Sequence, residues 1–303
     1  MGHFQERVLF DEILASHLAY EVGGPADALV FPRDEAELVW LAAFCDQTSL
    51  PLTIIGNGTN LLVRDGGIRG LTVSLRKAFR EIQALTDTLT RKPVQVRCGG
   101  GVEKPELLEW AAARALSGLE FSSGVPGTIG GGIFMNAGTK YGCYGDILRK
   151  LRLFSRERGV FELKREDVHF GYRHQTAVQD SIVLSADFEL SPGNETEIRS
   201  TVSRIIAERA EKQPLELPSC GSTFKNPEGL SAGRLIERSG LKGLRVGAAE
   251  VSTKHANFIL NRGGAKASDI LALIDTIKEK IRKEFQVELE CEVIILGEDI
   301  PGS

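Results

Sequence analysis

The sequence has no pair of cysteines or histidines at a spacing typical of metal binding or redox chemistry. Its five cysteines and five histidines are scattered over 303 residues, and Cys-x-x-Cys, His-x-x-x-His and His-Glu-x-x-His are all missing. An odd and dispersed set of cysteines is typical of reduced thiols in a reducing compartment, and not of a disulfide framework or a zinc site. We therefore expect a protein without a metal.

Long apolar runs are also missing. The longest obvious run, residues 38–45, is too short to cross a bilayer. The first residues show neither the pattern of a signal peptide nor that of an acylation site. These absences predict a cytoplasmic protein that uses no membrane.

An excess of positive charge is the third absence. The net charge is −4, and acidic and basic residues are mixed along the chain. Binding of nucleic acid depends on a basic surface that neutralises phosphates, so we expect no nucleic acid partner. A small anionic ligand needs only a few local donors and is compatible with this charge.

Glycine, by contrast, is abundant. The chain has 33 glycines, and the first half contains clusters at residues 23–24, 56–70, 99–101 and 124–145. Glycine tolerates positive φ and lets the backbone approach other groups closely. Such clusters therefore indicate tight loops or cradles for a ligand.

Short strands and amphipathic helices alternate along the chain, which is long enough for two or three compact units. Asp34, with Glu37 three residues later, predicts a helix start. A second start at Asn194 follows the last domain boundary, and Pro214 ends that helix. The other expected elements are strands at residues 51–55, 71–75, 257–260 and 287–295, and helices at residues 105–117, 232–239 and 268–285. The interleaving predicts an α+β or α/β class, and the uneven spacing disfavours a barrel of eight equal repeats.

The first glycine loop, residues 55–60 (Ile-Gly-Asn-Gly-Thr-Asn), follows a predicted strand. Its backbone N–H groups and small polar side chains suit a pyrophosphate. It is not a Rossmann fingerprint, because Leu61 stands where the third glycine belongs and a strand follows. Taken alone, this loop is better explained as a tight turn.

The second loop, residues 124–138, has five glycines within residues 124–132, with apolar neighbours. These glycines look buried, as if the backbone packed against something flat, although a close crossing of two elements explains the same pattern. Two such loops in one half of the chain together favour a ligand site.

Three residues in the second half are candidates for chemistry. Arg173 can hold a carboxylate with two hydrogen bonds, or merely pair with a surface acid. Ser222 can donate a proton, or its loop can cap the helix that follows. Glu292 alternates with Glu288 and Glu290 along the last strand, which by default places all three in solvent. Gly-x-Ser-x-Gly is missing, so a serine hydrolase is not expected.

Five segments, in this order, resemble the UDP-N-acetylenolpyruvoylglucosamine reductase family, and the likeness covers about residues 19–297. The segments are residues 55–63, 124–138, 170–173 (Phe-Gly-Tyr-Arg), 221–227 (Gly-Ser-Thr-Phe-Lys-Asn-Pro) and 251–261. The resemblance implies an α+β fold of the vanillyl-alcohol-oxidase/PCMH type. Residues 1–75 and 76–192 would form two FAD-binding subdomains, and residues 193–303 a C-terminal substrate-binding domain.

The activity that the resemblance implies is reduction of UDP-N-acetylglucosamine enolpyruvate to UDP-N-acetylmuramate, with NADPH as the hydride source and non-covalent FAD as the carrier. This reaction belongs to peptidoglycan precursor synthesis, and through it to cell wall biogenesis, cell shape and cell division. No obligate protein partner is expected.

The same resemblance implies roles for particular residues. Arg173 would hold the substrate carboxylate, protonated Glu292 would help to stabilise the charge that develops there, and Ser222 would protonate the α carbon after hydride reaches the β carbon. Tyr172, Lys212 and Asn226 correspond to positions on the substrate side. The implied FAD contacts are Ile55, Gly56, Asn57, Gly58, Thr59, Asn60, Gly124, Val125, Pro126, Gly127, Thr128, Gly130, Gly131, Asn136, Ala137 and Gly138.

Two departures and two rivals stand beside this assignment. Many members have a threonine where this chain has Ala19. The stretch between Arg173 and Asn194 is short, which resembles the subclass without an inserted tyrosine loop. Arg204, Arg209 or Lys212 would then cover the sugar nucleotide. The rivals are a related FAD oxidase or dehydrogenase, whose flavin Cys143 would attach, and a non-catalytic binding protein.

Overall fold

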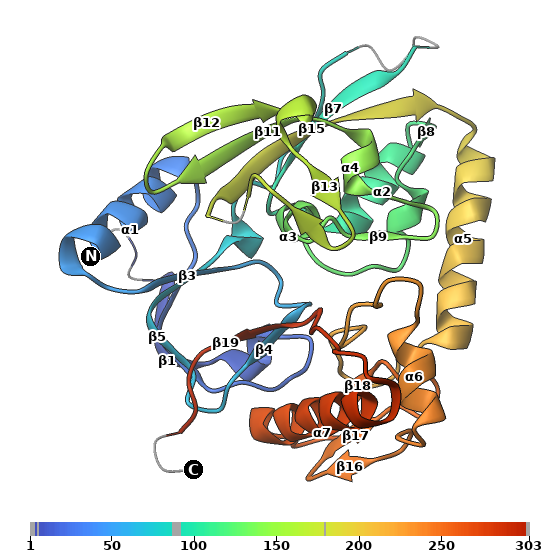
Figure 1. The fold of residues 1–303 in the computed structure, drawn as a ribbon. Helices are drawn as coiled ribbons and strands as arrows, with labels where there is room; N and C mark the ends of the chain where they lie inside the picture. Colours follow the sequence, from blue (N-terminus) through green and yellow to red (C-terminus); the bar gives the residue numbers. More distant parts are fainter. Residues whose placement is uncertain (1–3, 5, 87–91, 179, 301–303) are drawn as a thin grey trace. The chain divides into compact units, whose positions relative to one another are not determined.

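The computed structural model describes residues 4, 6–86, 92–178 and 180–300. The chain groups into two compact units, each assembled from separate stretches (Figure 1). Unit 1 contains Met1–Val30, Asn57–Thr72 and Ala210–Ser303, and unit 2 contains Phe31–Gly56 and Val73–Arg209. The division into three consecutive domains that the sequence suggested stays a prediction.

Unit 2 is built on an antiparallel sheet in the order β12-β11-β15-β7-β6, with β8 beside the end of β15. Its core contains Phe188 of β15 and the fully buried ring of Tyr144. The strands are β6 (Ile82–Ala84), β7 (Val94–Gly99), β8 (Leu116–Ser117), β11 (Leu148–Ser155), β12 (Gly159–Lys164) and β15 (Ile182–Pro192). An antiparallel sheet with separate helices decides for α+β over α/β.

Short helices cover this sheet, and the glycine-rich segments lie beside or within them. They are α2 (Lys104–Ala112), α3 (Ile129–Phe134) and α4 (Tyr144–Ile147). The contacts of α3 are with β7 and β15, and α4 also contacts β15. The remaining strands of unit 2 are β3 (Leu52–Ile55), β9 (Gly138–Thr139), β10 (Gly142–Cys143), β13 (Phe170–Gly171) and β14 (His174–Gln175).

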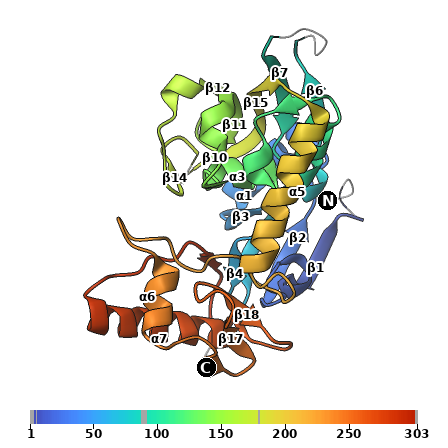
Figure 2. The same ribbon diagram turned by 90° about the vertical axis from the view of Figure 1, so that its right-hand side faces the viewer.

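Both helix starts expected from capping residues are confirmed. Helix α1 spans Glu35–Thr48, and the Asp34 carboxylate accepts a hydrogen bond of 2.9 Å from the Glu37 N–H. Helix α5, seen along its full length in Figure 2, spans Glu195–Lys212, and the Asn194 side chain accepts from two N–H groups of its first turn. These caps fix each helix start because they satisfy donors that have no partner within the helix.

Unit 1 has a small core around α7 (Ala267–Phe285). Isoleucine and leucine side chains recur on one face of α7 and are buried, while the carboxylate of Asp65 accepts from the Ala267 and Ser268 N–H groups at its start. The other elements are β1 (Val8–Ile13), β2 (Pro25–Val30), β4 (Leu61–Val63), α6 (Ala232–Arg238), β16 (Arg245–Val246), β17 (Ala249–Val251), β18 (Ile259–Asn261) and β19 (Ile294–Leu296).

Strands β1 and β2 pair antiparallel, β4 and β19 pair parallel, and β16, β17 and β18 form an antiparallel sheet. Strand β5 (Ile68–Ser74) runs from unit 1 into unit 2. The described residues also include 3-10 turns at Leu14–His17, Leu75–Lys77, Glu120–Ser122 and Arg165–Asp167. In the part of the chain that the structure describes, no helix is long and apolar enough to cross a membrane.

Two predicted elements were too long. The helix expected at residues 105–117 ends at Ala112, because Ala115 adopts a φ of 53° and the next residues pair with β15 as β8. The strand expected at residues 287–295 is reduced to β19, with a single bridge at Cys291 before it. Side-chain burial alternates at Glu288, Leu289 and Glu290 as expected, but no continuous ladder forms there.

Candidate functional site

The first glycine loop follows β3 and is tightly packed. A Cβ on Gly56 would lie 2.9 Å from Oγ1 of Thr128, so in unit 2 the first and second glycine loops are in contact. Gly58 has a φ of 63°, and a Cβ there would lie 2.5 Å from the carbonyl oxygen of His17. Close packing therefore accounts for both glycines, and within unit 2 Gly56 lies against Thr128 of the second loop.

The second glycine loop is bound to the segment after β7. Gly130 donates to the Gly100 carbonyl over 2.8 Å, Ile129 donates to Val102 over 2.8 Å, and Lys104 donates to Gly127 over 2.9 Å. These hydrogen bonds fix the loop backbone on one side. Its other side is available for a ligand, because Gly124 and Gly131 are exposed.

The expectation that these glycines are all buried was wrong, since only some are. Gly132 is buried, and a Cβ there would lie 2.8 Å from the Tyr144 ring and 2.9 Å from Cε of Lys104. Gly130 has a backbone oxygen 3.0 Å from its Cβ position. Close packing therefore explains these two glycines. Gly124 has a φ of 68° and lies against Arg209, whereas the exposed Gly131 is neither buried nor crowded.

Lys104 is a residue that the sequence analysis missed. Its side chain is 6% exposed, and its ammonium donates a hydrogen bond of 3.0 Å to the carbonyl oxygen of Pro126. Burial, reinforced by the positive charges of Arg173 and Arg209, lowers the pKa of the Lys104 amine to about 8. A buried lysine beside a glycine loop is a signal that only the folded chain reveals.

Asn136 connects the second loop to the segment that carries Arg173. Its amide nitrogen donates to the Gly171 carbonyl over 2.8 Å, and its oxygen accepts from the Gly145 N–H over 3.2 Å. Arg173 has a φ of 52°, and its guanidinium carbon lies 5.1 Å from the centre of the Tyr172 ring. A non-glycine residue held in the left-handed region is often found at functional sites, and here it determines the direction of the Arg173 side chain.

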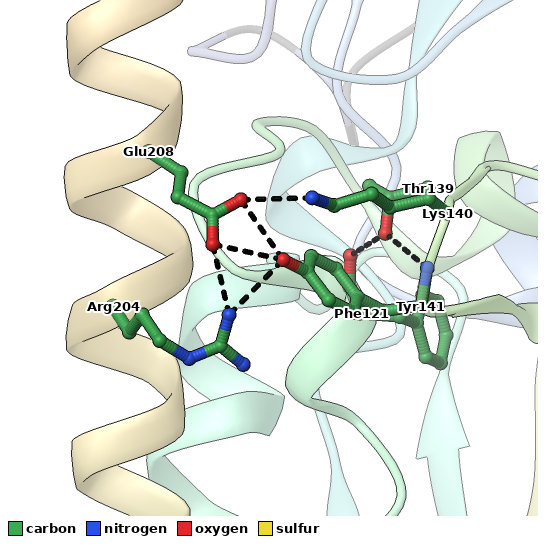
Figure 3. A network of polar contacts seen from close by, with 6 residues as sticks. All are labelled: Phe121, Thr139, Lys140, Tyr141, Arg204 and Glu208. Atoms are coloured by element: carbon green, nitrogen blue, oxygen red, sulfur yellow. Dashed lines mark hydrogen bonds and ion pairs between the residues drawn. The ribbon is translucent and has the colours of Figure 1, made fainter.

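A polar network anchors α5 to the β9–β10 hairpin (Figure 3). The Glu208 carboxylate accepts from the Lys140 ammonium at 3.0 Å, from the Tyr141 hydroxyl at 2.9 Å and from Arg204 at 2.9 Å. Hydrogen bonds from Lys140 and Tyr141 hold the pKa of Glu208 down at about 2. The network holds the turn of α5 that contains Arg204 and Glu208, and Arg209 directly follows Glu208 in this helix.

Arg209 lies against the second loop. A Cβ on Gly124 would be 3.1 Å from its Nε, which is buried and has no hydrogen-bond acceptor. An N–H donor of a cation without an acceptor, next to an exposed glycine, is suited to an anionic group of a bound ligand.

In unit 1, the segments that carry Ser222 and Glu292 lie side by side. Phe224 forms a bridge with Cys291, and the Glu292 N–H donates to the Thr223 carbonyl over 2.8 Å. Ser222 and Glu292 are both half-buried, so the default expectation of a fully exposed Glu292 was wrong. The bridge between Phe224 and Cys291 brings the Ser222 and Glu292 segments together, and the strand pattern in the sequence could not predict it.

Asn257 supports the Ser222 loop from within unit 1, and the sequence analysis gave it no role. Its side chain accepts from the Phe224 N–H over 3.0 Å and donates to the Phe224 carbonyl over 2.8 Å, while its own carbonyl accepts from Thr223. Asn257 is 3% exposed. The position of Ser222 therefore depends on one buried amide from a distant segment.

The other residues assigned from the resemblance have visible structural contacts. The Asn226 oxygen accepts from the Ala232 N–H at the start of α6, which supports the capping alternative for this loop. The Asn60 amide donates to the Glu292 carbonyl over 3.0 Å. Lys212 is exposed at the end of α5. The described residues hold no group of three His, Cys, Asp or Glu side chains that could bind a metal.

Comparison with known proteins assigns the class from these features. Residues 26–162 match the model of an FAD binding domain. Residues 213–296 match the model described as the UDP-N-acetylenolpyruvoylglucosamine reductase C-terminal domain. The first match includes both glycine loops, and the second includes Ser222 and Glu292. The chain is thus a flavoprotein of the FAD-dependent oxidoreductase class.

Relatives define the family more narrowly. The chain is 41% identical to the UDP-N-acetylenolpyruvoylglucosamine reductase of Moorella thermoacetica and 43% identical to that of Clostridioides difficile, in both cases over 97% of this chain and 95% of the relative. The crystal structure of the Thermus caldophilus reductase is 34% identical and superposes with a TM-score of 0.80, covering 94% of this chain and 98% of that one. The chain belongs to the UDP-N-acetylenolpyruvoylglucosamine reductase family, and the resemblance found in the sequence is confirmed.

Proposed function

We propose that this chain reduces UDP-N-acetylglucosamine enolpyruvate to UDP-N-acetylmuramate with NADPH, and so supplies a precursor of peptidoglycan. The observation that carries this proposal is likeness to reductases of this name over 97% of the chain. The paired Ser222 and Glu292 segments in unit 1 and the two glycine loops in contact in unit 2 support it.

FAD, when bound, carries the hydride from NADPH to the enolpyruvyl β carbon. The residues of this chain fit that group, because the exposed Gly124 of the second loop lies beside the Arg209 Nε–H, which has no acceptor. We assign the FAD contacts to the first and second loops as the resemblance implies. The flavin is held without a covalent bond.

Arg173 is assigned to the substrate carboxylate. Hydride addition places negative charge on the α carbon and the attached carboxylate, and a guanidinium with two parallel donors stabilises that charge. Tyr172, whose ring lies beside the Arg173 guanidinium, orients it. Protonated Glu292 is assigned, as the resemblance implies, as a further donor to that charge.

Ser222 is assigned as the proton donor to the α carbon. A serine hydroxyl is a weak acid, so it can serve only a strongly basic centre such as the one that hydride addition creates. Its loop is held by Asn257 and by the Glu292 segment, which limits the positions that the hydroxyl can adopt. Asn226 and Lys212 are assigned to the sugar nucleotide.

We place the chain in the subclass that lacks the inserted tyrosine loop. Strand β14 ends at Gln175 and β15 already begins at Ile182, which leaves little chain for an inserted loop before α5. Arg204, Arg209 and Lys212 of α5 are then the residues that cover the substrate. NADPH and substrate are assigned to one site in turn, as the resemblance implies, and the missing nicotinamide fingerprint fits this assignment. A cytoplasmic location stays a prediction.

The test is a spectroscopic titration under anaerobic conditions. The purified protein should show a flavin band that NADPH bleaches and that UDP-N-acetylglucosamine enolpyruvate restores. UDP-N-acetylglucosamine without the enolpyruvyl group is the matched control and should restore nothing. A band that only oxygen restores would contradict the substrate assignment, and a protein that takes up no FAD would contradict the flavoprotein assignment.

A further inference from the structure

The strongest observation that the proposed reaction leaves unused is the buried ammonium of Lys104. This side chain begins α2 and extends beneath the second glycine loop, where its Cε lies against Gly132 and its Nζ donates to the Pro126 carbonyl. The backbone of Lys104 adds a bond to Gly127. One residue thus holds the loop through both its main chain and its side chain.

The charges around this ammonium do not balance it. Arg173, from the loop after β13, and Arg209, from α5, are the charged groups that act on it, and both are positive. The neighbouring acids of its own segment, Glu103 and Glu106, are directed to Arg80. Among the described residues, Tyr144 of α4 also lies against Gly132, and burial raises the pKa of its hydroxyl, which therefore stays neutral.

A buried cation among other cations is unfavourable unless an anion completes the site. The second loop also carries the exposed Gly124 and Gly131, and the Arg209 Nε beside Gly124 has no acceptor. These groups converge on the loop where the proposed function places FAD, whose pyrophosphate is an anion.

We propose that Lys104 is a positioning residue for FAD: its buried ammonium braces residues 126–127 from behind, and the anionic cofactor supplies the negative charge that this part of unit 2 lacks. The inference rests on the proposed FAD site. It adds a coupling between cofactor and proton, because an anion beside the amine favours its charged form.

The flavin-free protein should therefore take up protons from solution when it binds FAD. The pKa of Lys104, lowered to about 8 without an anion, rises when FAD is bound, so at pH 8 about half a proton is taken up per FAD. At pH 6.5 the amine is already charged, and the uptake from this group falls close to zero. Arginine does not titrate in this range and cannot imitate the effect.

The experiment measures FAD binding to the full chain freed of flavin, by calorimetry in buffers of different ionisation enthalpy at pH 6.5 and pH 8. Lys104→Gln keeps a donor for the Pro126 carbonyl and removes the charge, and it should lose the proton uptake and bind FAD about tenfold more weakly. Lys104→Met should lose the uptake as well. Lys164→Met, which removes an exposed lysine of the same unit, should behave as the unchanged protein.

Three results would overturn the inference while leaving the proposed function intact. The first is FAD binding without proton uptake at pH 8, and the second is the same uptake in Lys104→Gln. The third is uptake that appears only when uridine diphosphate is added to the FAD-loaded protein, which would assign the missing anion to the sugar nucleotide. Failure of the unchanged protein to bind FAD would instead overturn the proposed function.

Discussion

The two compact units hold their functional groups by different means. Unit 2 presents a backbone loop and cations: Lys104 is buried beneath the loop, and Arg209 has an N–H without an acceptor. Unit 1 presents neutral or acidic groups: Ser222, on a loop that the amide of Asn257 holds, and Glu292, on the segment paired with that loop. This difference indicates that the cations of unit 2 are suited to stabilise negative charge, whereas the fixed loop of unit 1 is suited to position a proton donor. Substitutions in the two units should therefore separate the stabilisation of negative charge from proton transfer.

The largest effect is expected from Ser222→Ala. Loss of a positioned proton donor should lower kcat by about 10²- to 10⁴-fold, because general acid catalysis contributes on that scale. Flavin reduction by NADPH should be unchanged, since it does not need that proton. Rapid-mixing measurements of the two half-reactions separate these steps, and full turnover in the variant would remove Ser222 from the mechanism.

Arg173→Lys tests the corresponding group of unit 2. Lysine keeps the charge but loses the planar pair of donors, so kcat/KM for the enolpyruvyl substrate should fall by about 10²-fold. The visible spectrum of the bound flavin should stay as it is. A steady-state assay with a parallel flavin titration checks both, and a variant with weakened FAD binding and normal turnover would contradict the assignment.

Asn257→Ala should unfold more easily than any surface variant. It leaves the Phe224 N–H and carbonyl buried without partners, at a cost of about 2–4 kcal/mol in the free energy of unfolding. Asn194→Ala, which removes an exposed helix cap, is the matched control and should lose only about 1 kcal/mol. Denaturant unfolding of both variants gives the comparison, and equal losses would show that Asn257 does not hold the Ser222 loop.

Lys104→Met should change how stability depends on pH in the flavin-free protein. The ordinary lysine pKa of 10.5 applies in the unfolded chain, and burial lowers it to about 8 in the folded chain. Between these values the unfolded state binds more protons, so raising the pH stabilises the unchanged protein but not the variant. The unfolding free energy of the unchanged protein minus that of the variant should therefore rise from pH 8 to pH 10.5, by at most about 3 kcal/mol. A difference that stays constant with pH would contradict the lowered pKa.

The smallest effect is expected from Tyr141→Phe. This change removes one hydroxyl from the exposed network around Glu208 and leaves Lys140 and Arg204 in place. Exposed ion pairs contribute little, so the unfolding midpoint should fall by about 2 °C or less. The Tyr141 hydroxyl accepts a hydrogen bond of 3.1 Å from Arg204, so if Arg204 covers the substrate, KM for the sugar nucleotide should rise about threefold with kcat unchanged. Lys164→Met serves again as the control.

The fold class, the helix caps and the motif segments could be predicted from the sequence because they depend on neighbouring residues. Asp34 and Asn194 predict the starts of their helices, and the glycines at residues 55–60 predict a tight loop. Contacts between distant segments could not be predicted. Asn257 gave no signal because its partner at Phe224 belongs to another motif, and Lys104 looked like any lysine at the start of a helix until its burial was known.

The interleaving of the two units determines the order in which they can be completed during synthesis. Every segment of unit 2 has emerged once Arg209 is made, whereas unit 1 still waits for the stretch from Ala210 onward. The N-terminal strands are made first, yet Tyr20 is held through its carbonyl by Asn261, which is made near the end. Domains generally fold as units and in the order of synthesis. Here Tyr20 and Val22 are an exception, because they lie in one core with residues of α7 and need the nearly finished chain before their side chains are covered.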